Sequence, residues 1–316
     1  MNANHICHKL MKDSHMNFSQ LQSFVALADT GSFTEAAYNI NLTQSAVSHA
    51  LAALENELGV ILLERNRKGV VALTTVGQMI IPHVRTLLAS ASAIEQEAKA
   101  ARGEARGKLR LGSIESIVSP DLLVGVLTSF HTSYPDIEVV LFEGALHEIG
   151  EWIEQNIIDV GFAVLPAGEL ESTLLTTDEL CVLVASGHCL HAQTKVTPRE
   201  LREEGFVMER TACSLQLMKK AGLVQSRTGP HIRYQANGSA TIHAMVREGL
   251  GITLVPRMML PKKLEGVVAL PLDPPPLLQI GLAVKSQKMA SRAAKLFIQT
   301  ALAWTQGQAS LLASAR

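Results

Sequence analysis

Residues 42–69 read LTQSAVSHALAALENELGVILLERNRKG, and this stretch decides the interpretation of the N-terminal part of the chain. Thr43 is a suitable N-cap and Gly59 is typical of the position after a last turn, so the spacing predicts a helix between them. One side of this helix is apolar, through Val47, Ala50, Leu51, Leu54 and Leu58. Such a stripe packs on a core and leaves the opposite side to solvent.

The solvent side of the helix begins with four hydrogen-bonding side chains. They are Gln44, Ser45, Ser48 and His49, which form two pairs spaced four residues apart, so each pair shares a face. Such side chains at the start of a helix can read base edges in the major groove of DNA, and the helix N-terminus favours a phosphate. A polar face is also normal for any amphipathic surface helix, so the pattern alone leaves both interpretations open.

The flanking segments fit a helix-turn-helix followed by a wing. Apolar spacing predicts a helix over 18–29 that stops at Gly31, and SFTEAAYNI (32–40) predicts a short capped helix, separated from the next by three or four residues. VILLERNRKGVVALT (60–74) predicts a β-hairpin whose basic residues can neutralise phosphates. Those residues are Arg65, Arg67 and Lys68.

The charge of this region argues against DNA binding by one copy. Residues 17–73 hold five acids (Asp29, Glu35, Glu55, Glu57 and Glu64) and only the three bases of the hairpin. Two or four copies on one DNA would supply the missing positive charge.

A long helix is predicted over 75–101. Its apolar positions are Val76, Ile80, Val84, Leu87, Ala91, Ile94 and Ala98. A helix of this length spans roughly 40 Å and has little of its own domain to bury the seam, which favours pairing with a second copy. The alternative is a solvated helix folded onto its own domain. Pro82 is expected to bend the helix or to lie near its first turns.

Beyond a Gly/Arg hinge, ARGEARGK (101–108), strands and helices alternate. Strands are predicted over 108–112, 137–142, 158–164, 180–185, 206–209, 231–235, 251–255 and 279–284. Helices are predicted near 120–132, 146–156, 214–222, 239–249 and 289–305. This order indicates α/β units with largely parallel sheets, in two subdomains with a cleft between them. The expected divisions are a flexible leader (1–15), a winged helix-turn-helix (16–74), a linker helix and hinge (75–107) and an α/β domain (108–316) with crossovers near 166–180 and 271–279.

Hydroxyl and carboxylate side chains follow several of these strands or open the next helix. The candidates for ligand contact are Ser113, Glu115, Ser116, Glu143, Thr211, Ser239 and Thr241. Ligands of open α/β sheets lie at such strand ends, and free N–H groups at helix starts suit an anion. The two glutamates favour an amine or a neutral ligand instead. Each residue alone also fits an ordinary helix cap.

Composition limits the class of protein. The chain has 316 residues, of which 47% are hydrophobic and 18% charged, with a net charge of −1. It can therefore bury large cores, but no general field attracts it to nucleic acid or membrane. No apolar run of about 18 residues and no apolar signal core occur, so a cytoplasmic protein without membrane contact is expected. Met11 and Met16 are alternative starts.

The four cysteines are too few and too scattered for a disulfide framework. Cys189 and Cys213 form a candidate thiol switch, with His188 and His191 placed to lower the pKa of Cys189. Metal binding by these histidines with Cys189, or by HICH at 5–8, is a weaker alternative, and no metal or other cofactor is expected.

Residues 17–77 resemble the N-terminal domain of LysR-type transcriptional regulators. The resemblance lies in LQSFVALADTGSFTEAA (21–37), TQSAVSHALAALENELGVILLER (43–65) and LTTVG (73–77). A looser similarity to the family's effector-binding domain lies in GKLRLGS, PDIEVVLFEG, IDVGFAV and VREGLGITLVP. The resemblance implies a winged helix, a dimerising linker helix and a domain like periplasmic solute-binding proteins.

The resemblance also implies a homotetramer that binds promoter DNA, answers to a small-molecule effector and contacts RNA polymerase. It implies that the DNA is contacted by Thr34, Thr43, Gln44, Ser45, Ser48, His49, Arg65, Arg67 and Lys68. His49 stands where the family often has arginine, which puts the strength of phosphate contact in doubt. Leu63 stands where phenylalanine is usual, which affects packing.

The competing hypothesis is a cytoplasmic α/β enzyme or solute-binding protein whose N-terminal helices only dimerise. The sequence has no phosphate-binding glycine loop, nucleophile elbow or zinc-ligand helix, so an enzyme is not expected. A thiol-based redox regulator is a lesser variant of the first hypothesis.

Overall fold

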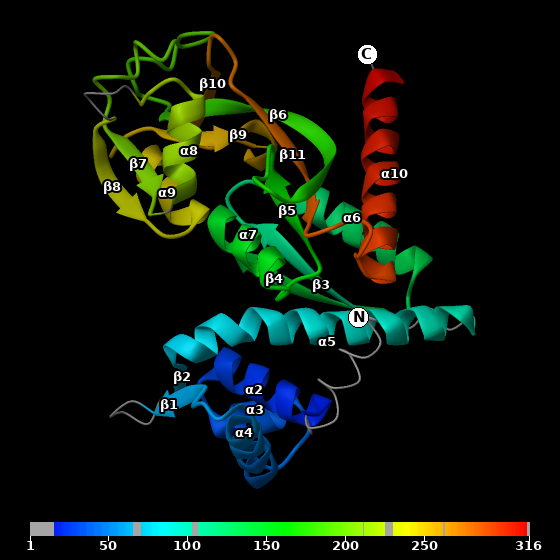
Figure 1. Ribbon diagram of the computed structural model, residues 1–316. Helices are drawn as coiled ribbons and strands as arrows, with labels where there is room; N and C mark the ends of the chain where they lie inside the picture. Colours follow the sequence, from blue (N-terminus) through cyan, green and yellow to red (C-terminus); the bar gives the residue numbers. More distant parts are fainter. Residues whose placement is uncertain are drawn as a thin grey trace, which may run out of the picture. The chain divides into compact units, whose positions relative to one another are not determined.

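The computed structural model describes residues 16–65, 71–102, 107–210, 212–224, 230–261 and 263–314 (Figure 1). Backbone contacts divide the chain into two compact units, 1–95 and 96–316. Across the described ranges, every helix is too short or too polar to cross a membrane. The predicted leader, 1–15, lies outside the described residues.

The N-terminal unit begins with three helices and a small hairpin, as predicted. The elements are α2 (Phe18–Thr30), α3 (Phe33–Asn39), α4 (Gln44–Leu58), β1 (Leu63–Arg65) and β2 (Val71–Leu73). Asn17 and Gln20 form a reciprocal capping box at the start of α2, and Gly31 ends that helix in the left-handed region at φ 64°. The strands pair antiparallel, with Leu63 opposite Leu73. The turn between them, 66–70, lies outside the described residues.

Helix α4 packs on the core of this unit through the predicted stripe. Val47, Leu51 and Leu54 are buried, whereas Leu58 at the C-terminal end is exposed. The Glu55 carboxylate accepts hydrogen bonds from the backbone N–H groups of Leu62 (2.7 Å) and Leu63 (3.2 Å). The end of α4 is therefore tied to the first strand of the hairpin.

Helix α5 (Thr75–Ala101) has the predicted bounds and continues through Pro82. Thr74 caps it, because the Thr74 hydroxyl accepts from the Gly77 N–H at 3.0 Å and donates to the Ile61 carbonyl at 2.8 Å. A Cβ on Gly77 would lie 2.1 Å from the Leu62 carbonyl oxygen, so only glycine fits this approach. Of the predicted seam, Val84 is buried in the N-terminal unit, as is its neighbour Ile81 on the helix, whereas Val76, Leu87, Ile94 and Ala98 are exposed. The large apolar side chains exposed on α5 are Val76, Met79, Leu87 and Ile94.

The C-terminal unit is built around one long curled sheet (Figure 1). Its first half contains β3 (Gly107–Ile114), β4 (Ile137–Gly144) and β5 (Val160–Val164), with α6 (Pro120–Ser133), α7 (Leu146–Glu154) and α10 (Arg292–Ser314). The second half of the unit contains β9 (Thr253–Pro256) and β10 (Val267–Pro271) of this sheet. It also contains a separate two-stranded sheet, formed by β7 (Phe206–Glu209) and β8 (Ile232–Ala236). Helices α8 (Ala212–Lys220) and α9 (Ser239–Arg247) and a short 3-10 turn, η1 (Arg257–Met259), belong to this half.

Two strands, β6 (Glu171–Ala185) and β11 (Leu277–Val284), carry the chain between the halves. Residues 171–179 of β6 pair with β11, whereas residues 180–185 pair with β9 and β10. The continuous strand β6 therefore joins the two subdomains. The change of pairing partner between residues 179 and 180 marks the border between them.

The structure corrects four predictions for this unit. The sheet is mixed rather than largely parallel, because β6 pairs antiparallel with β11, β9 and β10. Residues 171–180, expected in a crossover, are strand, because residues 171–179 form a ladder with β11 and Leu180 pairs with β9. Strand β10 was missed. Helix α8 starts at Ala212, so Ser214 lies inside it. The PPP stretch at 274–276 is irregular, as expected for the crossover near 271–279, whereas residues 277–279 belong to β11.

Candidate nucleic-acid interface and ligand pocket

The N-terminal end of α4 presents a continuous polar surface. The Thr43 hydroxyl accepts the Ala46 N–H at 3.2 Å and lies 3.0 Å from the Ser45 hydroxyl. The Gln44 and Ser45 N–H groups belong to the first turn, so the helix itself does not use them. The predicted contact residues of α4 are all exposed: Thr43, Gln44, Ser45, Ser48 and His49. This surface offers donors, acceptors and a helix N-terminus together.

Helix α3 adds to the exposed side chains of this unit. Thr34 is exposed, as DNA contact requires, while Ala36 and Ala37 are buried on the other side of the helix. Tyr38, one turn after Thr34, is 84% exposed. Tyr38 was not among the predicted contacts, although its i+4 spacing from Thr34 places both side chains on one face of the helix. An exposed phenol on that face can hydrogen-bond to a phosphate.

The predicted basic wing is described only in part. Its two strands pair as an antiparallel hairpin. Leu63, which stands where the family usually has phenylalanine, is buried in the core, so the difference affects packing there. The Arg65 side chain and all of Arg67 and Lys68 lie outside the described residues. Their role on the DNA backbone stays a prediction.

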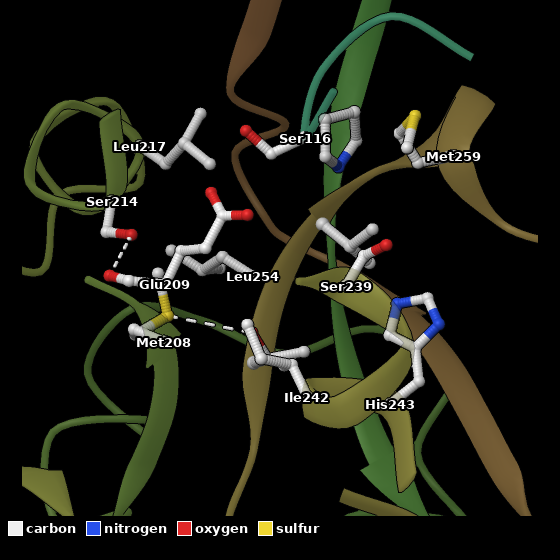
Figure 2. Close-up of a pocket in the computed structure, with 13 residues that line it drawn as sticks. Ser116, Met208, Glu209, Ser214, Leu217, Ser239, Ile242, His243, Leu254 and Met259 are labelled. Carbon is white, nitrogen blue, oxygen red and sulfur yellow. Dashed lines mark hydrogen bonds between the residues drawn. The ribbon is translucent and has the colours of Figure 1, made fainter. Parts of the chain in front are cut away.

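The C-terminal unit contains a small pocket beside β7, with a cavity volume of about 70 Å³. Apolar side chains form much of the wall, including Met208, Leu217 and Ile242 (Figure 2). The polar lining residues are Ser116, Glu209, Ser214, Ser239, His243 and Thr253. Ser116 follows β3 of the first half, and the others come from the second half, so both subdomains contribute. This volume is below the roughly 300–1,000 Å³ that is usual for small-molecule sites.

Internal hydrogen bonds already hold two of the hydroxyls. The Ser214 hydroxyl donates to the Glu209 carbonyl at 2.8 Å, and the buried Thr253 hydroxyl donates to the Met208 sulfur at 3.6 Å. Both bonds tie β7 to its neighbours. Burial lowers the pKa of His243, so this imidazole is neutral at pH 7. The one carboxylate in the lining is that of Glu209.

Only some of the predicted ligand residues lie at the pocket. Ser116 and Ser239 line the pocket. Ser113 is buried in β3 opposite Glu143 of β4, and that glutamate is exposed. Glu115 and Thr241 are also exposed outside the lining, and Thr211 lies outside the described residues. Glu209 and His243 were not predicted: Glu209 ends the strand predicted over 206–209 and was overlooked there, whereas His243 lies inside α9, beyond the helix start.

The cysteines occupy different environments. Cys181 is buried in β6, and burial raises the pKa of its thiol, although the Arg257 guanidinium opposes this shift. Cys189 is exposed, with its sulfur 3.7 Å from Nδ1 of His188. His191 turns its Nδ1 to the His188 carbonyl at 2.7 Å. The Cys213 side chain and Cys7 are outside the described residues, so the predicted switch stays a prediction.

Both parts of the chain match known protein families. Residues 18–78 match the bacterial regulatory helix-turn-helix protein, lysR family, and residues 102–306 match the LysR substrate binding domain. The HTH-type transcriptional regulator YvbU of Bacillus subtilis is 35% identical over 298 residues, covering 90% of this chain and 98% of that protein. The dual regulator OxyR of Escherichia coli is 28% identical, covering 85% and 90%.

Solved structures share the fold. A full-length OxyR variant from Pseudomonas aeruginosa superposes with a TM-score of 0.75 at 22% identity, covering 91% of this chain and 95% of that chain. CbnR complexed with its target DNA gives a TM-score of 0.60 at 21% identity, covering 92% and 100%. Together with the two domain matches and the identity to YvbU, the order of helix-turn-helix, long helix and two-part α/β domain leads to one conclusion: this chain belongs to the LysR family of transcriptional regulators.

Proposed function

We propose that the chain binds promoter DNA with the N-terminal end of α4 in the major groove. The observation that carries this proposal is the exposed set Gln44, Ser45, Ser48 and His49 beside a capped helix N-terminus. Thr34, Thr43 and Tyr38 approach the flanking backbone, and Arg65, Arg67 and Lys68 neutralise phosphates from the wing. The side chains of α4 carry sequence specificity, whereas the wing contributes salt-dependent affinity.

The working form is a homodimer or homotetramer. The five acids and three bases of residues 17–73 give one copy little electrostatic affinity, and several copies on one DNA overcome this. Val76, Met79, Leu87 and Ile94 leave apolar surface exposed on α5. Burying these side chains against a second copy of the helix stabilises the pair. CbnR, which shares the fold, is described as complexed with its target DNA.

A small molecule in the pocket beside β7 controls this binding. Ligand contact with Ser116 on one side and Ser239, Glu209 and His243 on the other changes the relative pose of the two subdomains. The spacing of the winged helices in the oligomer changes with it, and DNA bending and contact with RNA polymerase follow. The neutral His243 and the single carboxylate favour a ligand with hydrogen-bond donors or an amine. The protein works in the cytoplasm by binding, without catalysis.

A gel-shift with the DNA upstream of the chain's own gene tests the proposal. We expect a retarded complex that weakens with added salt and responds to the effector. Unchanged migration at low salt, with and without cell extract, favours the enzyme or solute-binding alternative. Thermal-shift screening of residues 108–316 and of the full chain against metabolite pools identifies the effector.

A second candidate is thiol-based control, favoured by the exposed Cys189 sulfur beside His188. Relatives at 28% identity carry the name hydrogen peroxide-inducible genes activator. Peroxide treatment of the wild type and of the Cys189→Ser and Cys213→Ser variants tests it. Loss of the peroxide response of DNA binding in both variants supports the switch, and an unchanged response in both removes it.

A further inference from the structure

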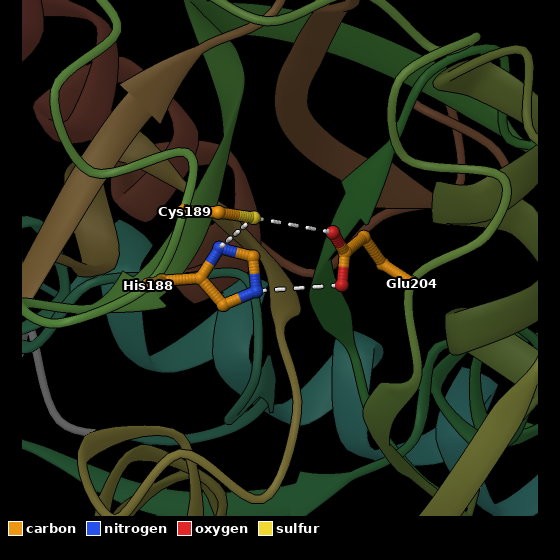
Figure 3. Close-up of side chains that lie close together, drawn as sticks. All are labelled: His188, Cys189 and Glu204. Atoms are coloured by element: carbon orange, nitrogen blue, oxygen red, sulfur yellow. Dashed lines mark hydrogen bonds and ion pairs between the residues drawn. The ribbon is translucent and has the colours of Figure 1, made fainter.

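Three metal-ligating side chains meet in the segment between β6 and β7 (Figure 3). The Cys189 sulfur lies 3.7 Å from His188 Nδ1 and 3.9 Å from Glu204 Oε1. Nε2 of His188 lies 3.3 Å from Glu204 Oε2. One ligand atom from each residue lies within 4.8 Å of the others. The effector pocket does not include this cluster.

These separations match those of donors around one tetrahedral cation. Zinc bonds of about 2.0–2.1 Å to nitrogen and oxygen and about 2.3 Å to sulfur place neighbouring donors about 3.3–3.7 Å apart. The 3.3 Å contact joins Nε2 to Oε2, whereas the 3.7 Å contact joins the sulfur to Nδ1, and only one ring nitrogen of His188 can bind the ion. The sulfur–Nδ1 distance falls in this range, and the sulfur–Oε1 distance of 3.9 Å is slightly longer. Nδ1, beside the sulfur, is therefore the nitrogen that would bind the ion.

The backbone holds the three residues in place. Leu190 and Leu201, next to the cluster on each side, are buried and anchor their turns in the core. The Leu190 N–H donates to His188 Nδ1 at 3.3 Å, which places the proton of the neutral ring on Nε2, facing Glu204. The His188 and Glu204 side chains are 18% and 25% exposed, so the site is partly desolvated but open to an ion from solvent through Cys189.

We propose that His188, Cys189 and Glu204 bind one thiophilic divalent cation, Zn²⁺ or a chemically similar ion, with water in the fourth position. The thiol proton leaves to solvent as the cation–sulfur bond forms, and Nδ1 of the neutral imidazole exchanges its hydrogen bond from the Leu190 N–H for the cation, while the proton on Nε2 stays directed at Glu204. A thiolate with an imidazole selects zinc-like ions over Mg²⁺ and Ca²⁺, which prefer oxygen ligands. The sequence suggested His191 as the third ligand beside His188 and Cys189. In the structure the third side chain is Glu204, which lies 15 residues after Cys189.

Cobalt titration of the full-length, reduced, chelator-treated protein tests the site, because a cobalt–thiolate bond absorbs in the near ultraviolet. We expect one Co²⁺ per chain with this absorption, and displacement by Zn²⁺. Cys189→Ser should abolish the absorption. Glu204→Gln and His188→Gln should weaken cobalt affinity by roughly 10- to 100-fold or more. Circular dichroism checks that each variant is folded.

Two matched controls make the test specific. Glu203→Gln removes the exposed neighbouring carboxylate, and Cys7→Ser removes the thiol of the N-terminal HICH stretch. Both should leave cobalt affinity and absorption unchanged. The proposal is overturned if folded Cys189→Ser keeps the absorption, if Cys7→Ser loses it, if Glu204→Gln binds as the wild type does, or if the reduced wild type binds no cobalt.

Discussion

The polar N-terminal end of α4, proposed to contact DNA, and the pocket beside β7 differ in how much of the chain builds them. The first two turns of one capped helix, residues 43–49, supply the polar surface of α4, and a single stripe on the same helix holds it against the core. The pocket takes its lining from segments between Ser116 and Met259, which meet only because β6 carries the sheet from one subdomain to the other. The first site is therefore sensitive to local changes and the second to changes across a whole domain. Each should be removable without the other.

The largest effect is expected from Leu54→Ala, which removes a fully buried side chain from the α4 stripe. The cavity should lower the free energy of unfolding of the N-terminal unit by roughly 2–5 kcal/mol and abolish DNA binding at physiological temperature. Effector binding should persist. Leu58→Ala, at an exposed position of the same helix, is the control and should change the melting temperature little. Equal losses of DNA and effector binding in Leu54→Ala contradict the separation.

A smaller effect is expected from the double variant Gln44→Ala and Ser48→Ala. Both side chains are exposed, so the fold should be preserved, while specific DNA binding weakens by roughly 1–3 kcal/mol for each lost base contact. Gel-shift titrations at constant salt measure the change. Gln78→Ala, an exposed glutamine at the start of α5, is the matched control. Specific affinity equal to that of the control variant would remove α4 from the interface.

The pocket is tested by comparing two glutamates. Glu209→Gln changes the carboxylate of the lining and should weaken effector binding by about 1.5–3 kcal/mol if the ligand bonds to it, as measured by calorimetry. Glu143→Gln changes a carboxylate that the sequence singled out but that lies outside the lining, and should have no effect. The reverse result would favour the strand-end prediction over the pocket.

The smallest effect concerns pH. Burial lowers the pKa of His243 below its ordinary value of about 6.5, so the unfolded chain binds this proton more readily than the folded chain. The associated stability is complete above about pH 6.5 and falls as the pH drops below that value. The melting temperature of the C-terminal unit should fall less between pH 7 and pH 5 in His243→Gln than in the wild type. His131→Gln, at an exposed position, serves as the control and should behave as the wild type does. Identical pH profiles in both variants would contradict the assignment.

Helical periodicity made most of the N-terminal unit predictable. The cap at Thr43, the stripe at Val47, Leu51 and Leu54 and the stop at Gly59 act within one helix, so their spacing carries the information. The same holds for α5, whose bounds agree with the prediction. The exposure of Tyr38 was visible in principle from its spacing, but its neighbours in the sequence gave no reason to single it out.

The pocket and the mixed sheet were less accessible to sequence reasoning. Spacing indicates where a strand lies but not which strand it pairs with, and β6 changes partners along its length. Glu209 ends the strand predicted over 206–209, so its position carried the same signal as the predicted candidates, but spacing did not show which strand ends meet at the pocket. Glu204 is similar, because only the fold of the segment 186–205 brings it to His188 and Cys189.

The most direct measurement is a loss-of-contact experiment with the wild type and Ser48→Ala on operators substituted at each base pair in turn. If α4 reads base edges, Ser48→Ala should become indifferent to substitution at one position in each half-site while keeping its discrimination elsewhere. A uniform loss of affinity across all operators, or an unchanged specificity profile, would show that the start of α4 does not contact the bases.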